Sequence, residues 1–158
     1  MESQNPKNVL FVCLGNICRS PAAEGVLRHL VAEKGLEERI RVDSAGTGSY
    51  HIGEPADARM MRAAARRGYE LTSVARQITR ADYDNFDLIV AMDRENLANL
   101  MERVPEQCFH VRLLTSFLPP DTPSDVPDPY YLGDDGFETV LDLLEEACPK
   151  ILEYLTER

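Results

Sequence analysis

The chain has 158 residues, of which 44% are hydrophobic, so it can form a globular domain with a core of its own. Its formal net charge of −10 argues against nucleic acid as a partner, and the lack of about 18 consecutive apolar residues argues against a membrane span. Residues 1–7 lack the basic and apolar regions of a signal peptide, so we expect a cytoplasmic protein. The four cysteines suggest neither a disulfide framework nor a zinc site, and we expect no metal or other cofactor.

Short apolar runs alternate with helical patterns along the chain, which predicts a parallel sheet covered by helices on both faces. The predicted strands are residues 8–12, 40–44, 88–92 and 109–114. The predicted helices are residues 20–34, residues 55–67, a short one that begins at Thr79, one that is capped by Asp93 and ends at Pro105, and residues 136–155. Pro149 lies inside the last pattern and should kink or split that helix. The fold class is therefore α/β, a single doubly wound domain over residues 1–158 with a four-stranded parallel sheet flanked by helices.

The segment between the first strand and the first helix, residues 13–21, carries the strongest functional signal, with the sequence Cys-Leu-Gly-Asn-Ile-Cys-Arg-Ser-Pro. Backbone N–H groups at a helix start are unpaired and carry the positive end of the helix dipole, so this segment is expected to bind phosphate. The same field favours the thiolate of Cys13, and Arg19 adds a planar donor fork that suits phosphate oxygens. Ser20 should either cap the helix or lie beside Cys13, and Pro21 suits the first helical position.

Taken singly, a cysteine after a strand is most often a small buried hydrophobe, and an arginine is usually a solvated surface charge. The combination of Cys-x5-Arg-Ser with a strand before it and a helix after it is more specific, because both loop length and context are constrained. Ligands bind at the carboxyl ends of the strands in such sheets, so Ser44, at the end of the second strand, and Asp93, at the end of the third, should meet this loop around the phosphate. For both residues the alternative is simple capping.

A proline-rich loop over residues 119–131 offers a proton donor, because its five prolines make it stiff and non-helical. Attack by Cys13 on a phosphate ester needs a proton for the departing oxygen. No histidine looks well placed for this step, since the three are predicted in a helix, a loop and a strand: His29, His51 and His110. Asp128, between two prolines, is the remaining candidate, although Asp beside Pro is common in plain turns. Tyr130 and Tyr131 are expected to wall a cleft that accepts a flat aromatic group.

These motifs occur in order with Asp-Ser-Ala-Gly-Thr at residues 43–47, Ala-Arg-Gln at 75–77, Met-Asp at 92–93 and Asp-Pro-Tyr-Tyr at 128–131. Together they resemble the low-molecular-weight protein tyrosine phosphatases over nearly the whole chain, and the acidic end resembles bacterial members. The resemblance implies that Cys13 is the nucleophile, Arg19 binds phosphate and the transition state, and Asp128 is general acid and then general base.

The resemblance also implies supporting roles around these three residues. The loop that binds phosphate would comprise Leu14, Gly15, Asn16, Ile17, Cys18, Arg19 and Ser20. Asn16 would hold the loop's shape with Ser44, Ser20 would stabilise the thiolate as leaving group, and Tyr50 would lie at the cleft rim. In animal members a His before the Ala-Arg-Gln segment supports the residue that matches Asn16, and here that position is Ser73, so the support of the loop is expected to differ.

Several alternatives stay open at this point. A thioredoxin-coupled arsenate reductase on the same fold needs two further cysteines close together after Ala75, and none occurs between Cys18 and Cys108. Phosphoarginine phosphatases carry Thr where Ile17 stands, and a non-catalytic phosphotyrosine-binding module would be expected to lack Cys13 or Asp128. The expected partners are a phosphotyrosine-containing protein as substrate and phosphate or vanadate as inhibitor, for a monomer or weak dimer. Cys13 and Cys18 are also predicted to form a protective redox pair.

Overall fold

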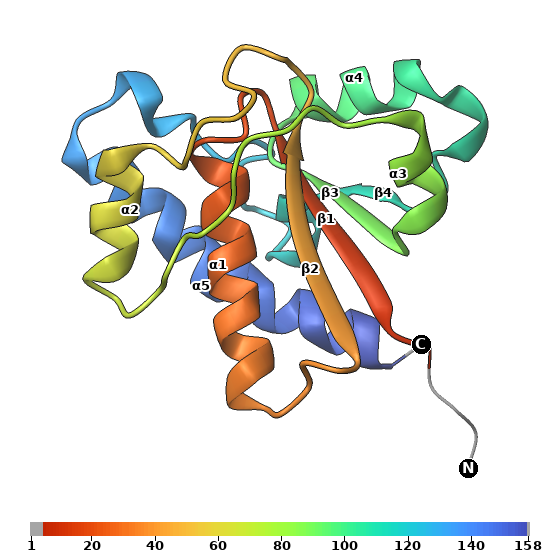
Figure 1. Ribbon diagram of the computed structural model, residues 1–158, viewed down its shortest axis with the longest axis horizontal. Helices are drawn as coiled ribbons and strands as arrows, with labels where there is room; N and C mark the ends of the chain where they lie inside the picture. The colour runs from red at the N-terminus through yellow and green to blue at the C-terminus, as the bar shows by residue number, and fades with distance from the viewer. Residues whose placement is uncertain (1–4, 158) are drawn as a thin grey trace.

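The computed structural model describes residues 5–157, apart from the side chain of Tyr131, and places a twisted sheet between two layers of helices (Figure 1). Its strands, in chain order, are β1 (Lys7–Cys13), β2 (Ile40–Gly46), β3 (Leu88–Ala91) and β4 (Val111–Leu113). All pairings are parallel and the strand order is β2-β1-β3-β4. The predicted four-stranded parallel sheet is confirmed.

The helices are α1 (Arg19–Glu33), α2 (Ala58–Ala65), α3 (Arg80–Asn85), α4 (Arg94–Arg103) and α5 (Asp134–Thr156), with short 3-10 turns η1 (Pro105–Gln107), η2 (Leu114–Phe117) and η3 (Pro129–Tyr131). Figure 1 shows α1, α2 and α5 on one face of the sheet and α3 and α4 on the other. Alternate residues of β1 accordingly enter two separate cores, with Phe11 packed under α1 and α5 and Leu10 on the side of α4. The doubly wound arrangement is therefore confirmed.

The predicted ends of the last strand and the predicted start of α2 were wrong. The last strand was expected over residues 109–114, but Phe109 is 84% exposed and precedes the strand, while Leu114 already belongs to η2. The apolar side chain of Phe109 suggested a strand residue, although single exposed apolar residues are normal. Helix α2 begins at Ala58 rather than at residue 55, because the Asp57 carboxylate caps it by accepting the amides of Arg59 and Met60.

Pro149 was expected to kink or split the last helix, and a split is excluded, because α5 runs without a break from Asp134 to Thr156. A proline inside a helix costs about 3 kcal/mol. The residues around it, Leu144, Cys148 and Ile151, are fully buried against α1 and the sheet, and each large apolar side chain contributes about 1.5–3 kcal/mol on burial. Burial of this face outweighs the lost hydrogen bond, so the helix continues through the proline.

The strand register brings the carboxyl ends of the three neighbouring strands β2, β1 and β3 to one edge of the sheet. Cys13 pairs with Gly46 across β1 and β2, and Val12 pairs with Ala91 across β1 and β3. The loops that follow these strands therefore start side by side, which is where a ligand site is expected. Among the helices within residues 5–157, none is long and apolar enough to cross a bilayer.

Candidate active site

The loop from Cys13 to α1 is braced by the end of β2. Thr47 donates its backbone N–H to the carbonyl of Cys13, and Gly48 donates to the carbonyl of Leu14, each at 2.9 Å. This close approach requires glycine at position 46, because a Cβ there would lie 2.8 Å from the Leu14 oxygen. Backbone hydrogen bonds thus hold the loop against the end of the second strand.

Asn16 lies at the centre of a buried hydrogen-bond network that holds the loop. It has a left-handed backbone conformation, with φ of 59°, and its side-chain amide donates to Ser20 Oγ at 2.8 Å and to Ser44 Oγ at 3.0 Å. Its Oδ1 accepts the backbone N–H of Arg76 at 3.0 Å. The backbone of residues 75–77 therefore supports Asn16 directly. This chain has Ser73 at the position where the supporting histidine of the animal phosphatases was expected.

Ser44, which lies inside β2, continues this network by donating to Glu24 Oε1 at 2.6 Å, so its role is not simple capping. The Glu24 side chain is 4% exposed and also pairs with Arg28 at 3.0 Å. Burial raises the pKa of Glu24 above its ordinary value, although the hydrogen bond from Ser44 and the charge of Arg28 oppose that change. The floor beneath the loop is therefore polar, buried and hydrogen-bonded.

The Cys13 sulfur lies 3.0 Å from Ser20 Oγ, in a region where both residues are buried. Helix α1 begins at Arg19 with Cys18 as its N-cap residue, so Ser20 is the second helical residue and Pro21 the third. Of the two predicted positions for Ser20, the one beside the sulfur is observed. The expectation that Pro21 occupies the first helical position was wrong, but it still falls in the first turn, where a missing N–H is tolerated.

Arg19 is buried, with only 3% of its surface exposed, and it is held by three groups. It donates to Asp93 Oδ2 at 2.7 Å and to the carbonyl of Val126 at 2.9 Å, and it approaches Asp128 Oδ2 at 3.6 Å. Burial disfavours the charge of a guanidinium, but the neighbouring Cys13, Asp93 and Asp128 outweigh this cost and raise the pKa of Arg19. A permanent positive charge is thus fixed at the base of the loop.

Asp93 takes both of the positions that the sequence left open. Its Oδ2 accepts from Arg19, while its Oδ1 accepts the backbone N–H of Asn96 and so caps α4. One carboxylate therefore orients the buried arginine and begins the helix after β3. The cap fixes the position of the carboxylate because it ties that side chain to the rigid first turn of a helix.

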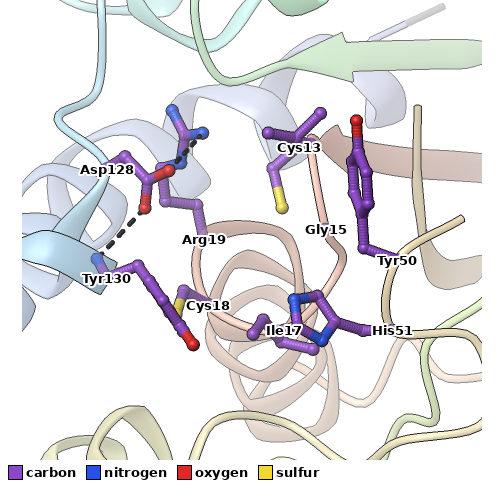
Figure 2. A pocket seen from close by; sticks show the side chains of 10 residues that line it. Cys13, Gly15, Ile17, Cys18, Arg19, Tyr50, His51, Asp128 and Tyr130 are labelled. Carbon is purple, nitrogen blue, oxygen red and sulfur yellow. Dashed lines mark hydrogen bonds and ion pairs between the residues drawn. The ribbon is translucent and has the colours of Figure 1, made fainter. Parts of the chain in front are cut away.

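These residues surround an open pocket of about 440 Å³, shown in Figure 2. Its lining comprises Cys13, Leu14, Gly15, Ile17, Cys18, Arg19, Tyr50, His51, Asp128 and Tyr130. Figure 2 shows the Cys13 sulfur pointing into the space between Tyr50 on one side and Asp128 with Tyr130 on the other. The side chain of Tyr131, also predicted in the cleft, lies outside the described residues.

His51 lines the pocket, which corrects the expectation that none of the three histidines is well placed. Its Nδ1 lies 3.0 Å from Glu54 Oε1, and a Cβ at position 15 would approach its ring to 3.0 Å, so glycine there makes room for the imidazole. The one sequence signal for His51 is its position directly after Tyr50. In an irregular loop, the order of two adjacent residues does not indicate which side chain turns into the pocket.

Cys18 lines the same pocket as Cys13, and its side chain is buried. Burial, together with the charges of Asp57, Cys13 and Asp128, raises the pKa of Cys18, so its thiol stays protonated at neutral pH. Both cysteines are free thiols in this structure. The surroundings of the two sulfurs therefore differ, because the Ser20 hydroxyl lies beside the sulfur of Cys13.

The model of the family described as low molecular weight phosphotyrosine protein phosphatase matches residues 8–158. The chain belongs to this family. It is 44% identical over 147 residues to the low molecular weight protein-tyrosine-phosphatase YfkJ of Bacillus subtilis, which covers 92% of this chain and 93% of that protein.

Solved structures of phosphatases agree with this assignment. The YfkJ crystal structure has a TM-score of 0.93, with 40% identity, over 99% of this chain and 98% of its own. A protein tyrosine phosphatase from Entamoeba histolytica with Hepes in its active site gives a TM-score of 0.92 and 45% identity over 96% and 97% of the two chains. A Drosophila arginine phosphatase gives 0.86 and 34% over 92% and 96%. The low-molecular-weight phosphatase fold thus extends over this chain, and its relatives differ in the named substrate.

Proposed function

We propose that this phosphatase hydrolyses phosphotyrosine in proteins, and aryl phosphates in general, through a cysteinyl-phosphate intermediate. The observation that supports the proposal most directly is the Cys13 sulfur beside a serine hydroxyl, in a pocket that Arg19 and Asp128 also line. Cys13 would be the nucleophile, Arg19 the phosphate binder and Asp128 the acid and base. No cofactor is needed for this chemistry, because the thiolate itself attacks phosphorus.

In the first step the phosphate group lies over the loop, where backbone N–H groups and the Arg19 fork bind its oxygens. The Cys13 thiolate attacks phosphorus, an S–P bond forms, and the bond to the phenolic oxygen breaks. Asp128, with 38% of its side chain exposed at the pocket, donates its proton to that oxygen as it leaves. The product phenol departs neutral, which removes the cost of expelling an anion.

In the second step a water molecule attacks phosphorus, Asp128 accepts its proton, and the S–P bond breaks to release phosphate. Ser20 is suited to stabilise the departing thiolate, because Asn16 donates a hydrogen bond to its oxygen at 2.8 Å. The serine's own proton is then available for the Cys13 sulfur at 3.0 Å. Asn16 and Ser44 would thereby contribute to catalysis by orienting Ser20 and the loop.

The pocket walls support an aromatic substrate. Tyr50 and Tyr130 flank the opening, and flat aromatic walls favour a phenyl ring between them. Phosphoarginine is a second candidate substrate because a relative of this fold is named an arginine phosphatase, but the apolar Ile17 in the lining favours the phenolic ring. For an arsenate reductase the further cysteines would be Cys108 and Cys148, and both lie outside the pocket lining.

The experiment compares hydrolysis of phosphotyrosine, phosphoserine and phosphoarginine peptides in the presence of a chelator. We expect turnover of the phosphotyrosine peptide with chelator present, and none by Cys13→Ser, with Cys108→Ser as the matched control that keeps full activity. Faster turnover of the phosphoarginine peptide would replace the substrate assignment. Activity in Cys13→Ser shown free of wild type would refute the nucleophile, and loss on chelation would refute the metal-independent mechanism.

The remaining proposals concern the setting of the enzyme. We propose that residues 1–158 form one phosphatase domain that acts as a monomer or weak dimer in the cytoplasm. Inorganic phosphate and vanadate are proposed as competitive inhibitors, because both are tetrahedral oxyanions that match the loop. Gel filtration with light scattering tests the oligomeric state, and inhibition kinetics test the oxyanions.

A further inference from the structure

Arg59 lies outside the pocket lining, on the first turn of α2, and connects that helix to the loop that carries Asp128. Its guanidinium forms a two-pronged contact with Asp57, with Nε at 3.3 Å from Oδ1 and Nη2 at 3.2 Å from Oδ2. The same Nη2 donates to the backbone carbonyl of Tyr130 at 3.2 Å. One side chain thus spans two segments that are 71 residues apart.

The guanidinium also lies over two aromatic rings. Its central carbon is 5.4 Å from the ring centre of Tyr130 and 4.9 Å from that of Phe137 in α5. Arginine over an aromatic face is attracted by the ring's electron density. Arg59 therefore contacts the ring of Tyr130, which forms one wall of the pocket, and also contacts the buried ring of Phe137.

Asp57 extends this connection to the phosphate-binding loop. Its backbone N–H donates to the carbonyl of Ile17 at 2.8 Å, and its side chain caps α2. Burial opposes ionisation of Asp57, but the hydrogen bonds from Arg59 and from the helix amides lower its pKa, so the carboxylate stays charged. A continuous path therefore runs from Ile17 through Asp57 and Arg59 to Tyr130.

The path ends at Asp128. The backbone N–H of Tyr130 donates to Asp128 Oδ1 at 3.1 Å, so the peptide unit on one side of Tyr130 holds the carboxylate while the next is held by Arg59. The other flank of Asp128 is anchored separately, because Val126 donates to the carbonyl of Met92 and accepts from Arg19, both at 2.9 Å. The Arg59 contact is the corresponding anchor on the carboxyl side.

We propose that Arg59 is a positioning residue for the acid step, which holds Asp128 at the distance from Cys13 that proton transfer to the leaving oxygen requires. The inference rests on the proposed role of Asp128 as general acid. Lysine cannot replace Arg59, because an ammonium lacks the planar fork that binds Asp57 and the Tyr130 carbonyl together, and it does not stack on aromatic rings as a guanidinium does.

The test measures kcat and kcat/KM of Arg59→Ala and Arg59→Lys for aryl phosphates whose phenols differ in acidity. General acid catalysis contributes about 10²–10⁴-fold to the rate. If the acid is displaced, kcat should fall about tenfold with phenyl phosphate and less than about twofold with dinitrophenyl phosphate, whose leaving group needs no proton. Exposed Arg62, one turn later on the same helix, gives the matched control Arg62→Ala, which should behave as wild type. Thermal unfolding of each variant, together with activity on the dinitrophenyl ester, separates a displaced acid from an unfolded protein.

Asp128→Ala is measured in parallel to separate the two proposals. If Asp128→Ala shows the leaving-group dependence and Arg59→Ala does not, the role of Arg59 is refuted and the proposed function stands. If Asp128→Ala itself loses the same factor on every ester, both are refuted. In the double variant Arg59→Ala/Asp128→Ala the dependence should equal that of Asp128→Ala alone, because a residue that acts through Asp128 has no further effect once that carboxyl is gone; an additional loss on poor leaving groups would contradict the proposal.

Discussion

Replacing Asn16 by alanine should destabilise the protein by about 3–4 kcal/mol, and the structure explains each part of that figure. The side chain makes three hydrogen bonds, to Ser20, to Ser44 and from the amide of Arg76, in a region where Asn16 is 1% exposed. A net hydrogen bond contributes about 1 kcal/mol, which gives about 3 kcal/mol for the three. Alanine also adopts the left-handed conformation observed here, with φ of 59°, at a cost of about 1 kcal/mol.

Glycine at the same position separates the two contributions. Asn16→Gly loses the same three hydrogen bonds but adopts positive φ without a Cβ, so it should be roughly 1 kcal/mol less destabilised than Asn16→Ala. The assay is equilibrium urea unfolding, with vanadate affinity measured on the folded fraction as a report on the loop. A loss below about 1 kcal/mol for the alanine variant would refute the additive reasoning. Equal stability of the two variants would refute the backbone part.

Three further predictions follow from the same site. Cys13→Ser should retain vanadate binding while losing turnover, because the loop amides and Arg19 remain; isothermal titration that detects no binding would contradict this. Peroxide inactivation should be reversed by dithiol in wild type but not in Cys18→Ser, because the Cys18 thiol captures the sulfenic acid of Cys13 as a disulfide; equal recovery, with no linked Cys13–Cys18 peptide in mass spectrometry, refutes the redox pair. Burial raises the pKa of Glu24 in the folded protein, so above pH 4.5 the unfolded chain loses this proton before the folded one and stability falls as pH rises. The Glu24→Gln side chain still accepts from Ser44 and carries no charge. Its free energy of unfolding in urea, relative to that of wild type, should therefore be higher at pH 7.5 than at pH 5, and a difference independent of pH contradicts the assignment.

The sequence predicted the parts of the fold that local signals determine. Apolar runs separated by helical patterns predicted the strands and their parallel arrangement, and Thr79 marked the start of α3, where the structure shows that it forms a capping box with Asp82. The errors arose where tertiary packing decides, as at Pro149, whose helix is held together by its buried face, and at Phe109, which is apolar but exposed. Neither outcome can be read from the neighbouring residues alone.

The candidate site divides in the same way. Cys13, Arg19 and Ser20 lie within one loop, so their spacing already implies that they share a site. His51 and Arg59 belong to segments whose positions depend on how the chain crosses the sheet, and no local pattern distinguishes them from ordinary surface residues. Their contacts exist because the loop after β2 turns back over the loop between β1 and α1, where the Asp57 backbone N–H donates to the Ile17 carbonyl, and because the proline-rich segment returns to meet Arg59 of α2 at Tyr130. The residues proposed to carry out the chemistry are thus the more predictable ones, since reactivity requires particular side chains at fixed spacing. The residues proposed to position them depend on contacts across the fold, and only a structure identifies those.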